Sequence, residues 1–203
     1  MEVKFTEKGD GWIKFRVKGI SIALANSLRR SMMMEIPVMA IEWVDFKKND
    51  SILPDEVLAN RLGLIPLHFS KKAYVLPEKC KCKGKGCSRC QVRLVLKKKG
   101  PCVVYSGDLK SEAKDVYPVF ENIPIVELFE GEELSLEAIA QLGKGVQHAK
   151  WQASITSYEY DDGTFEFYVE TVSGLTPKEI VKLGIESLLE KVKEARKLVE
   201  STK

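Results

Sequence analysis

Towards its C-terminus the chain reads Ile155-Thr-Ser-Tyr-Glu-Tyr-Asp-Asp-Gly-Thr-Phe-Glu-Phe-Tyr-Val-Glu170, in which apolar and polar residues alternate on both sides of a turn. This pattern predicts a β-hairpin with strands over 155–160 and 164–170. A helix is expected directly after it, because Thr176 and Glu179 form a capping box and Pro177 stands at the first helical position. Strands followed by a long helix indicate an α+β fold.

The predicted C-terminal helix, over 177–200, carries more apolar surface than a single sheet needs. One set of its residues steps by four and three, as in a heptad seam: Val181, Ile185, Leu188, Val192, Ala195 and Val199. Three further apolar residues widen this face: Ile180, Leu189 and Leu198. Two interpretations are open, a face covered entirely by the chain's own core and a face shared with a second chain. We favour the second, since an apolar surface of this size seldom stays exposed in a monomer.

The N-terminal part predicts a second hairpin and a second helix. Val3 and Phe5 alternate with polar residues before the turn at 8–11, and Ile13, Phe15 and Val17 alternate after it. Ser21 is placed to cap a helix over 22–35, and Pro37 ends it. A strand over 38–46 is apolar on both faces, which predicts a central position in a sheet. We expect Trp43 and Trp151 to be core anchors.

The middle of the chain has shorter elements. A short helix is expected over 54–62, closed by Gly63, followed by an extended segment over 64–67. Short strands are expected over 92–96, 102–106, 123–128 and 134–140. This part therefore reads as a β-rich insert with a small core of its own.

Four of the five cysteines fall in one loop of this insert, Cys80-Lys-Cys-Lys-Gly-Lys-Gly-Cys-Ser-Arg-Cys90. A CxC pair, a glycine-rich turn and a CxxC pair are able to converge on one tetrahedral ion, which predicts structural zinc held by Cys80, Cys82, Cys87 and Cys90. Two alternatives remain, disulfide pairing and thiols without a metal. Cys102 lies in an apolar run and is expected to be a small buried side chain, not a fifth ligand.

Composition excludes several classes of function. The chain has 203 residues, 44% of them hydrophobic and 30% charged, which suits one large or two small globular domains. The net charge of +3 does not by itself indicate nucleic-acid binding. The N-terminus has no secretory pattern and no apolar run reaches membrane-spanning length, so we expect a cytoplasmic protein without a membrane partner. With only two histidines and no Ser/His/Asp set or phosphate loop, we expect no catalytic residues.

Three segments resemble the family of the archaeal RNA polymerase D subunit, which corresponds to the bacterial α-subunit N-terminal domain and the eukaryotic third-largest subunit. They are Ala25-Asn-Ser-Leu-Arg-Arg30, Asn60-Arg-Leu-Gly-Leu-Ile-Pro-Leu67 and Gly143-Lys-Gly-Val-Gln-His-Ala-Lys-Trp151, with the cysteine loop between the second and third. The resemblance implies a discontinuous dimerisation domain over 1–46 and 153–203, built from an antiparallel sheet and two long helices, with a β-rich insert domain over 47–152.

The resemblance also implies a function and partners. The chain is expected to be a non-catalytic assembly platform of DNA-dependent RNA polymerase that pairs with subunit L through the heptad seam and docks the large catalytic subunits, touching DNA only indirectly. Candidate docking residues are Asn26, Arg29, Arg30, Arg61, His148 and Lys150. The planar guanidinium groups suit two-point binding of a partner carboxylate or carbonyl.

The chain departs from the family at one place. Many members carry a ferredoxin-like module with an iron–sulfur cluster before the last hairpin, whereas here Trp151-Gln-Ala-Ser-Ile155 runs straight into it. No iron–sulfur cluster is therefore predicted, and the module is either absent from this member or removed at Ala153-Ser154. The alternative function is a stand-alone zinc-containing nucleic-acid-binding protein, suggested by the lysines of the cysteine loop. Aromatic residues for base stacking are missing there.

Overall fold

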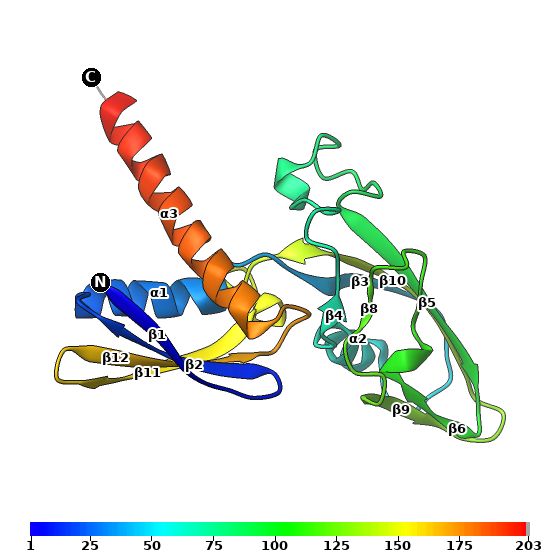
Figure 1. The fold of residues 1–203 in the computed structure, drawn as a ribbon. Coiled ribbons are helices and arrows are strands. Elements are labelled where there is room, and N and C mark those ends of the chain that lie inside the picture. The colour runs from blue at the N-terminus through cyan, green and yellow to red at the C-terminus, as the bar shows by residue number, and fades with distance from the viewer. Residues whose placement is uncertain (202–203) are drawn as a thin grey trace. The chain divides into compact units, whose positions relative to one another are not determined.

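The computed structural model describes residues 1–201 and is an α+β protein with antiparallel sheets and three α-helices (Figure 1). The chain divides into two compact units. The first combines Met1–Pro37 with the part of the chain from Lys144 onward, and the second is Val38–Gly143. The sequence-based boundaries lie nine residues later at each junction. The difference arises because the strand that begins at Val38 pairs inside the second unit.

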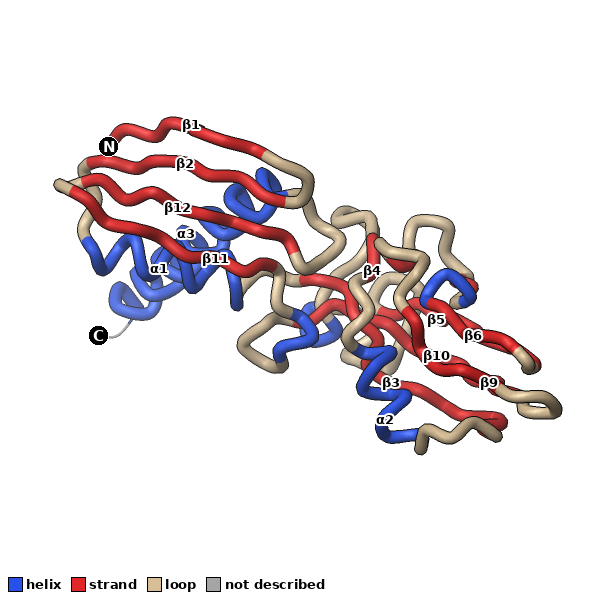
Figure 2. The backbone as a smooth tube through the Cα atoms, turned by 90° about the horizontal axis from the view of Figure 1, so that it is seen from below, coloured by secondary structure: helices blue, strands red, loops and turns tan. Residues whose placement is uncertain are grey.

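The sheet of the first unit has four antiparallel strands, and both predicted hairpins are part of it. Its strands are β1 (Glu2–Lys8), β2 (Trp12–Lys18), β12 (Thr164–Thr171) and β11 (Ser154–Asp161), in the order β1-β2-β12-β11 (Figure 2). The two chain ends meet where β2 pairs β12 with Phe15 opposite Phe167. Their rings stack at 5.0 Å, and both side chains are fully buried.

Two helices pack on one face of this sheet, α1 (Ile22–Met34) against β11 and α3 (Pro177–Ser201) against β12 and β2 (Figure 2). Both predicted helix starts are confirmed. The Ser21 hydroxyl accepts from the Leu24 N–H at 3.2 Å, and the Thr176 N–H donates to the Glu179 carboxylate at 2.9 Å. These bonds satisfy backbone donors that have no partner within the helix.

The second unit contains a separate antiparallel sheet in the order β3-β10-β5-β7. Its strands are β3 (Val38–Asn49), β10 (Glu133–Gly143), β5 (Gln91–Lys99) and β7 (Lys110–Ser111). Around it lie α2 (Asp55–Gly63), the strand pair β4 (Leu67–His68) with β8 (Tyr117–Pro118), and the strand pair β6 (Cys102–Tyr105) with β9 (Pro124–Leu128).

Two expectations about β3 are wrong. The strand lies at the edge of its sheet, not in the centre, because only β10 pairs with it. Residues 38–41 are buried, but the rest of the strand is not, and Trp43 is 62% exposed. The apolar residues of this strand therefore reflect a buried strand start and an exposed tryptophan, whereas Trp151 is buried as expected.

Within residues 1–201, no helix combines the length and the apolar character that crossing a membrane requires.

Candidate functional site

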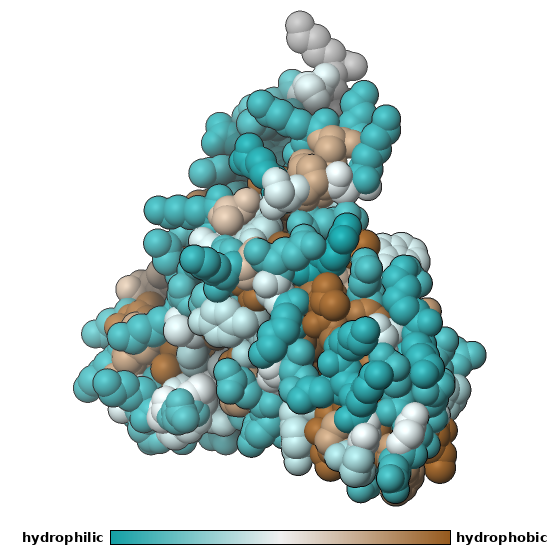
Figure 3. Space-filling view, turned by 90° about the vertical axis from the view of Figure 1, so that its right-hand side faces the viewer, coloured by the Kyte–Doolittle hydropathy of each residue, from teal (hydrophilic) through white to brown (hydrophobic). Residues whose placement is uncertain are grey.

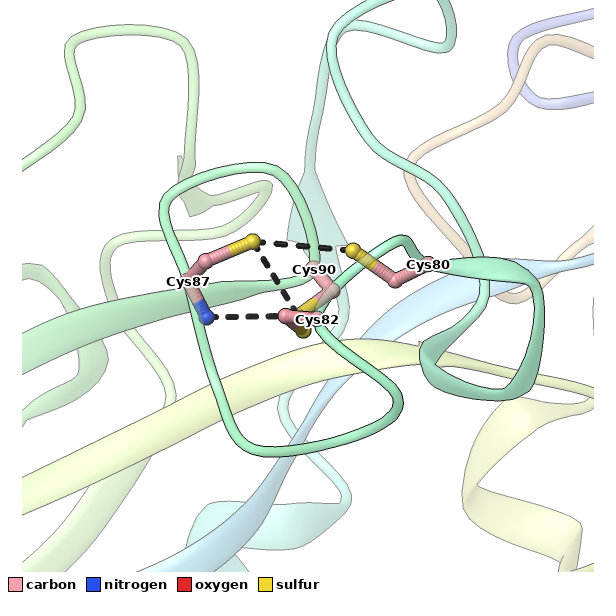
Figure 4. Close-up of side chains that lie close together, drawn as sticks. All are labelled: Cys80, Cys82, Cys87 and Cys90. Atoms are coloured by element: carbon pink, nitrogen blue, oxygen red, sulfur yellow. Dashed lines mark hydrogen bonds between the residues drawn. The ribbon is translucent and has the colours of Figure 1, made fainter.

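The four cysteines of the loop converge in the second unit, with their sulfur atoms facing one another (Figure 4). The Sγ–Sγ distances are 3.5 Å for Cys80–Cys87, 3.5 Å for Cys82–Cys90 and 3.7 Å for Cys87–Cys90. All four sulfur atoms lie within 4.8 Å of one another. Cys102 is half-buried outside the cluster, and its thiol donates to the Lys99 carbonyl at 3.4 Å.

Two short turns bring the sulfur atoms together. The carbonyl of Cys80 accepts from the Lys83 N–H at 2.9 Å, and the carbonyl of Cys87 accepts from the Cys90 N–H at 2.9 Å. Gly84 and Gly86 between the turns have φ of 79° and 91°, a region that side chains with a Cβ rarely enter. The glycines of the motif are thus needed to fold the loop back on itself.

The geometry fits a tetrahedral metal better than disulfides. Four Zn–S bonds of about 2.3 Å in a tetrahedron place the sulfur atoms about 3.8 Å apart. A disulfide needs about 2.05 Å, and all five cysteines are free. The residues present therefore match the ligand set and spacing of a four-thiolate zinc site.

Burial and neighbouring thiols shift the pKa values of Cys82 and Cys90 in opposite directions. A hydrogen bond from the Cys80 thiol is the main reason that the pKa of the Cys82 thiol is lowered to about 6. Burial raises the pKa of the Cys90 thiol to about 12. Because thiolates, not thiols, bind metals, a metal has to displace protons here, above all from Cys90.

A second candidate surface is the apolar face of α3. In its first turns Ile180, Val181 and Gly184 are buried against the first unit, whereas every residue from 189 to 200 is exposed. The heptad residues Val192 and Val199 are 60% and 75% exposed. Near the upper end of the molecule in Figure 3, apolar patches lie between hydrophilic side chains. The C-terminal half of the predicted seam is thus exposed within the described residues 1–201, and its role in dimerisation stays a prediction.

The edge strand β1 adds apolar surface to the same unit. Every residue of β1 is exposed, including Val3 and Phe5. Phe5 contacts Phe15 with ring centroids 5.8 Å apart, so it lies on the face of the sheet that the helices cover over the other strands. Among the described residues, no helix packs on β1 closely enough to bury it.

A third candidate surface is a groove of about 530 Å³ at the C-terminal end of α1. Two of the resembling segments meet there, because residues of 25–30 and of 143–151 both line it. The Val146 N–H also donates to the Met34 carbonyl at 3.1 Å. The helices α1 and α3 and the loop after Gly143 line the groove. The lining residues include Asn26, Arg29, Arg30, Val146, Leu188 and Lys191. The Arg29 guanidinium donates to Asn26 Oδ1 at 3.0 and 3.2 Å, so Asn26 holds Arg29 in place.

The remaining candidate residues have partners within their own unit. Arg61 donates to the Pro124 carbonyl at 2.8 Å in the second unit. His148 Nδ1 accepts from the Lys150 N–H at 3.1 Å, so its ring caps the 3₁₀ turn Ala149–Trp151. The Lys150 ammonium lies 4.5 Å from the centroid of the Trp151 ring. These contacts give Arg61, His148 and Lys150 local roles, and their role in docking stays a prediction.

The sequence interpretation missed two residues near the groove. Gly184 allows α3 to approach α1, since a Cβ there would lie 2.6 Å from Met32 Cγ, and the Ser31 hydroxyl donates to the Gly184 carbonyl at 2.7 Å. A glycine inside a strong helix pattern was the available signal. Glu35 forms ion pairs with Lys144 and Lys191, and no local pattern links residues so far apart.

Comparison with known proteins places these features in a family. The chain is 47% identical over 164 residues to DNA-directed RNA polymerase subunit Rpo3 of Methanothermobacter thermautotrophicus, covering 79% of this chain and 62% of that protein. It is 48% identical over 166 residues to the Rpo3 subunit of Methanosphaera stadtmanae, covering 79% of this chain and 61% of that protein. It is 46% identical over 151 residues to the Rpo3 subunit of Archaeoglobus fulgidus, covering 74% of this chain and 57% of that protein.

The chain spans about three fifths of the length of these curated relatives. The comparisons do not favour a stand-alone nucleic-acid-binding protein. The family model described as RNA polymerase Rpb3/RpoA insert domain matches residues 44–161, which is more than half of the chain. The chain therefore belongs to the RNA polymerase Rpb3/RpoA insert domain family.

Proposed function

We propose that this chain is a non-catalytic subunit of an archaeal DNA-directed RNA polymerase, corresponding to the D subunit, and that it serves as a platform for assembly. The observation that carries this proposal is the uncovered apolar face of α3 in a chain whose relatives are named as RNA polymerase subunits. An exposed apolar seam on a long helix is stabilised when a second chain covers it.

The partner proposed for this face is subunit L. A helix laid along α3 would cover the exposed seam residues, and it would extend the helical layer of the first unit beyond the chain's own two helices. Val3 and Phe5 offer further apolar surface on the uncovered strand β1. Burial of each large aliphatic side chain contributes about 1.5–3 kcal/mol, and several such residues together offset part of the entropy that two chains lose when they associate.

The large subunits are proposed to dock in the groove at the end of α1. Arg30 is exposed there, and Arg29 is held by Asn26 in a fixed orientation. A guanidinium group fixed in this way loses less conformational entropy when a partner carboxylate or carbonyl binds to it. The chemistry of polymerisation is assigned to those large subunits.

Zinc is proposed to occupy the cysteine cluster, held by Cys80, Cys82, Cys87 and Cys90, and to cross-link the loop of the second unit. We propose no iron–sulfur cluster for this chain, because Trp151-Gln-Ala-Ser-Ile155 contains no cysteine and leads directly into the last hairpin.

A matched pair of variants tests the heterodimer. Leu189→Ser with Val192→Ser removes apolar surface from α3, and we expect the affinity for subunit L to fall by more than about tenfold. Glu190→Ser with Lys193→Ser is the control, because it changes neighbouring exposed positions to the same residue and keeps the net charge. Light scattering after size exclusion measures the complex. An apolar double variant that binds as tightly as the control would contradict the proposal.

A further inference from the structure

Glu35 caps the C-terminal end of α1, where a negative charge is electrostatically unfavourable. It is the C-cap residue, and its N–H donates to the Ser31 carbonyl at 3.1 Å. A carboxylate at this position faces the negative end of the helix dipole, and the last turn of α1 has no basic residue to compensate it. The side chain is nevertheless only 17% exposed, so it is held against the protein instead of turning into solvent.

Two lysines from distant segments hold this carboxylate. Lys144 Nζ lies 3.7 Å from Glu35 Oε2, and Lys191 Nζ donates to Glu35 Oε1. Lys144 begins the loop after Gly143, whereas Lys191 lies on α3. Arg29, which lines the same groove, donates instead to Asn26 and to Met33 Sδ. One carboxylate thus links the end of α1 to two separate segments.

Lys191 lies on α3 between the packed first turns and the exposed half of the helix. The helix is fixed near its start, where Gly184 meets Met32 and Ser31. Within the described part of α3, Lys191 is the last residue that forms an ion pair with another element. All residues from 192 to 200 are exposed. The direction of the exposed half therefore depends on the contacts at 184 and 191.

We propose that Glu35 is a positioning residue that fixes both the exposed half of α3 and the loop at 144–147. This inference rests on the proposed function, because it assigns the orientation of the partner-binding helix and of the docking groove to one side chain. Lys191 lines the groove and precedes the exposed seam residue Val192. Binding at the groove and binding along α3 are then coupled through Glu35.

The test is Glu35→Gln, which keeps the shape of the side chain and removes its charge. Hydrogen exchange followed by mass spectrometry should become several-fold faster in two places, the peptide covering 185–192 and the loop at 144–147. Lys191→Gln should affect the helix peptide alone, and Lys144→Gln the loop alone. The affinity of Glu35→Gln for subunit L should fall about two- to fivefold, the range for a single charge pair.

Controls separate this inference from the proposed heterodimer. Glu194→Gln removes an exposed carboxylate from the same helix and should change neither exchange nor affinity. Glu35→Lys combined with Lys191→Glu reverses the pair and should restore protection of the helix peptide. If the wild-type chain binds subunit L and Glu35→Gln binds it equally well, Glu35 has no positioning role. If the wild-type chain does not bind subunit L, the proposed function fails. Unchanged hydrogen exchange in Glu35→Gln would by itself overturn the positioning role of Glu35.

Discussion

At the scale of single residues, Gly184 shows how one missing side chain sets the contact between the two long helices. A Cβ at this position would lie 2.6 Å from Met32 Cγ and 3.3 Å from the Met32 backbone. Alanine would favour the helix by about 1 kcal/mol over glycine, but the buried contact leaves no space for it. Overpacking in a core costs about 1–3 kcal/mol, so the clash is expected to outweigh the gain in helix propensity.

We therefore predict that Gly184→Ala lowers the free energy of unfolding by about 1 kcal/mol, the middle of the range that remains when the helix gain of about 1 kcal/mol is subtracted from a clash of about 1–3 kcal/mol. Chemical denaturation followed by circular dichroism measures this change. Lys182→Ala, on an exposed position of the same helix, should change stability by less than about 0.5 kcal/mol. A Gly184→Ala variant as stable as wild type would mean that α3 does not pack on α1 as closely as described.

At the scale of elements, the cysteine loop should bind one zinc ion with an affinity that falls as the pH is lowered. Bound cysteines must be thiolates, and the pKa of Cys90 is raised to about 12 by burial. Each proton that zinc displaces makes binding weaker at lower pH. Competition with a chromogenic chelator between pH 8 and pH 6 should show this loss, and an affinity independent of pH would contradict a thiolate site.

Two cysteine substitutions separate the cluster from the remaining thiol. Cys90→Ser removes a ligand and should abolish stoichiometric zinc binding, because a tetrahedral structural site uses all four thiolates. Cys102→Ser should bind one zinc per chain, since the Cys102 thiol donates to the Lys99 carbonyl and lies outside the cluster. The zinc content of the two purified variants tests these expectations. Equal loss of zinc in both variants would refute the assignment of ligands.

The sequence predicts elements well where the signal is local. Ser21, Thr176 and Glu179 mark helix starts through contacts within one turn, and both hairpins follow from alternation and turn residues. The edge position of β3 was missed, because apolar residues on both faces of a strand do not reveal how many neighbouring strands pair with it. The Glu35–Lys191 pair was missed because it joins residues 156 positions apart, which depends on how α1 crosses α3.

The candidate site was predictable to a similar extent. The spacing of the cysteines predicts their convergence, since glycines at 84 and 86 permit the two turns. The exposed seam follows from periodicity, but only the structure shows that burial ends near Leu188. Arg61, His148 and Lys150 were chosen by resemblance alone, and their contacts within the chain could not be foreseen from the residue types.

At the scale of the whole molecule, the division into two units predicts a local response to metal removal. The cysteine cluster lies entirely in Val38–Gly143, whereas α1 and α3 belong to the other unit. Treatment with a chelator should therefore speed hydrogen exchange around 75–95 and leave the exchange of α1 and α3 unchanged. Equal acceleration in both units would contradict a metal that acts only on its own unit.

The central claim is that the exposed half of α3 is one side of an interface with a companion subunit. Native mass spectrometry of the chain co-expressed with subunit L tests it most directly, because it reports stoichiometry and bound metal in one spectrum. The account predicts a complex with one copy of each chain and one zinc ion. A chain that remains a metal-free, stable monomer in the presence of subunit L would contradict it.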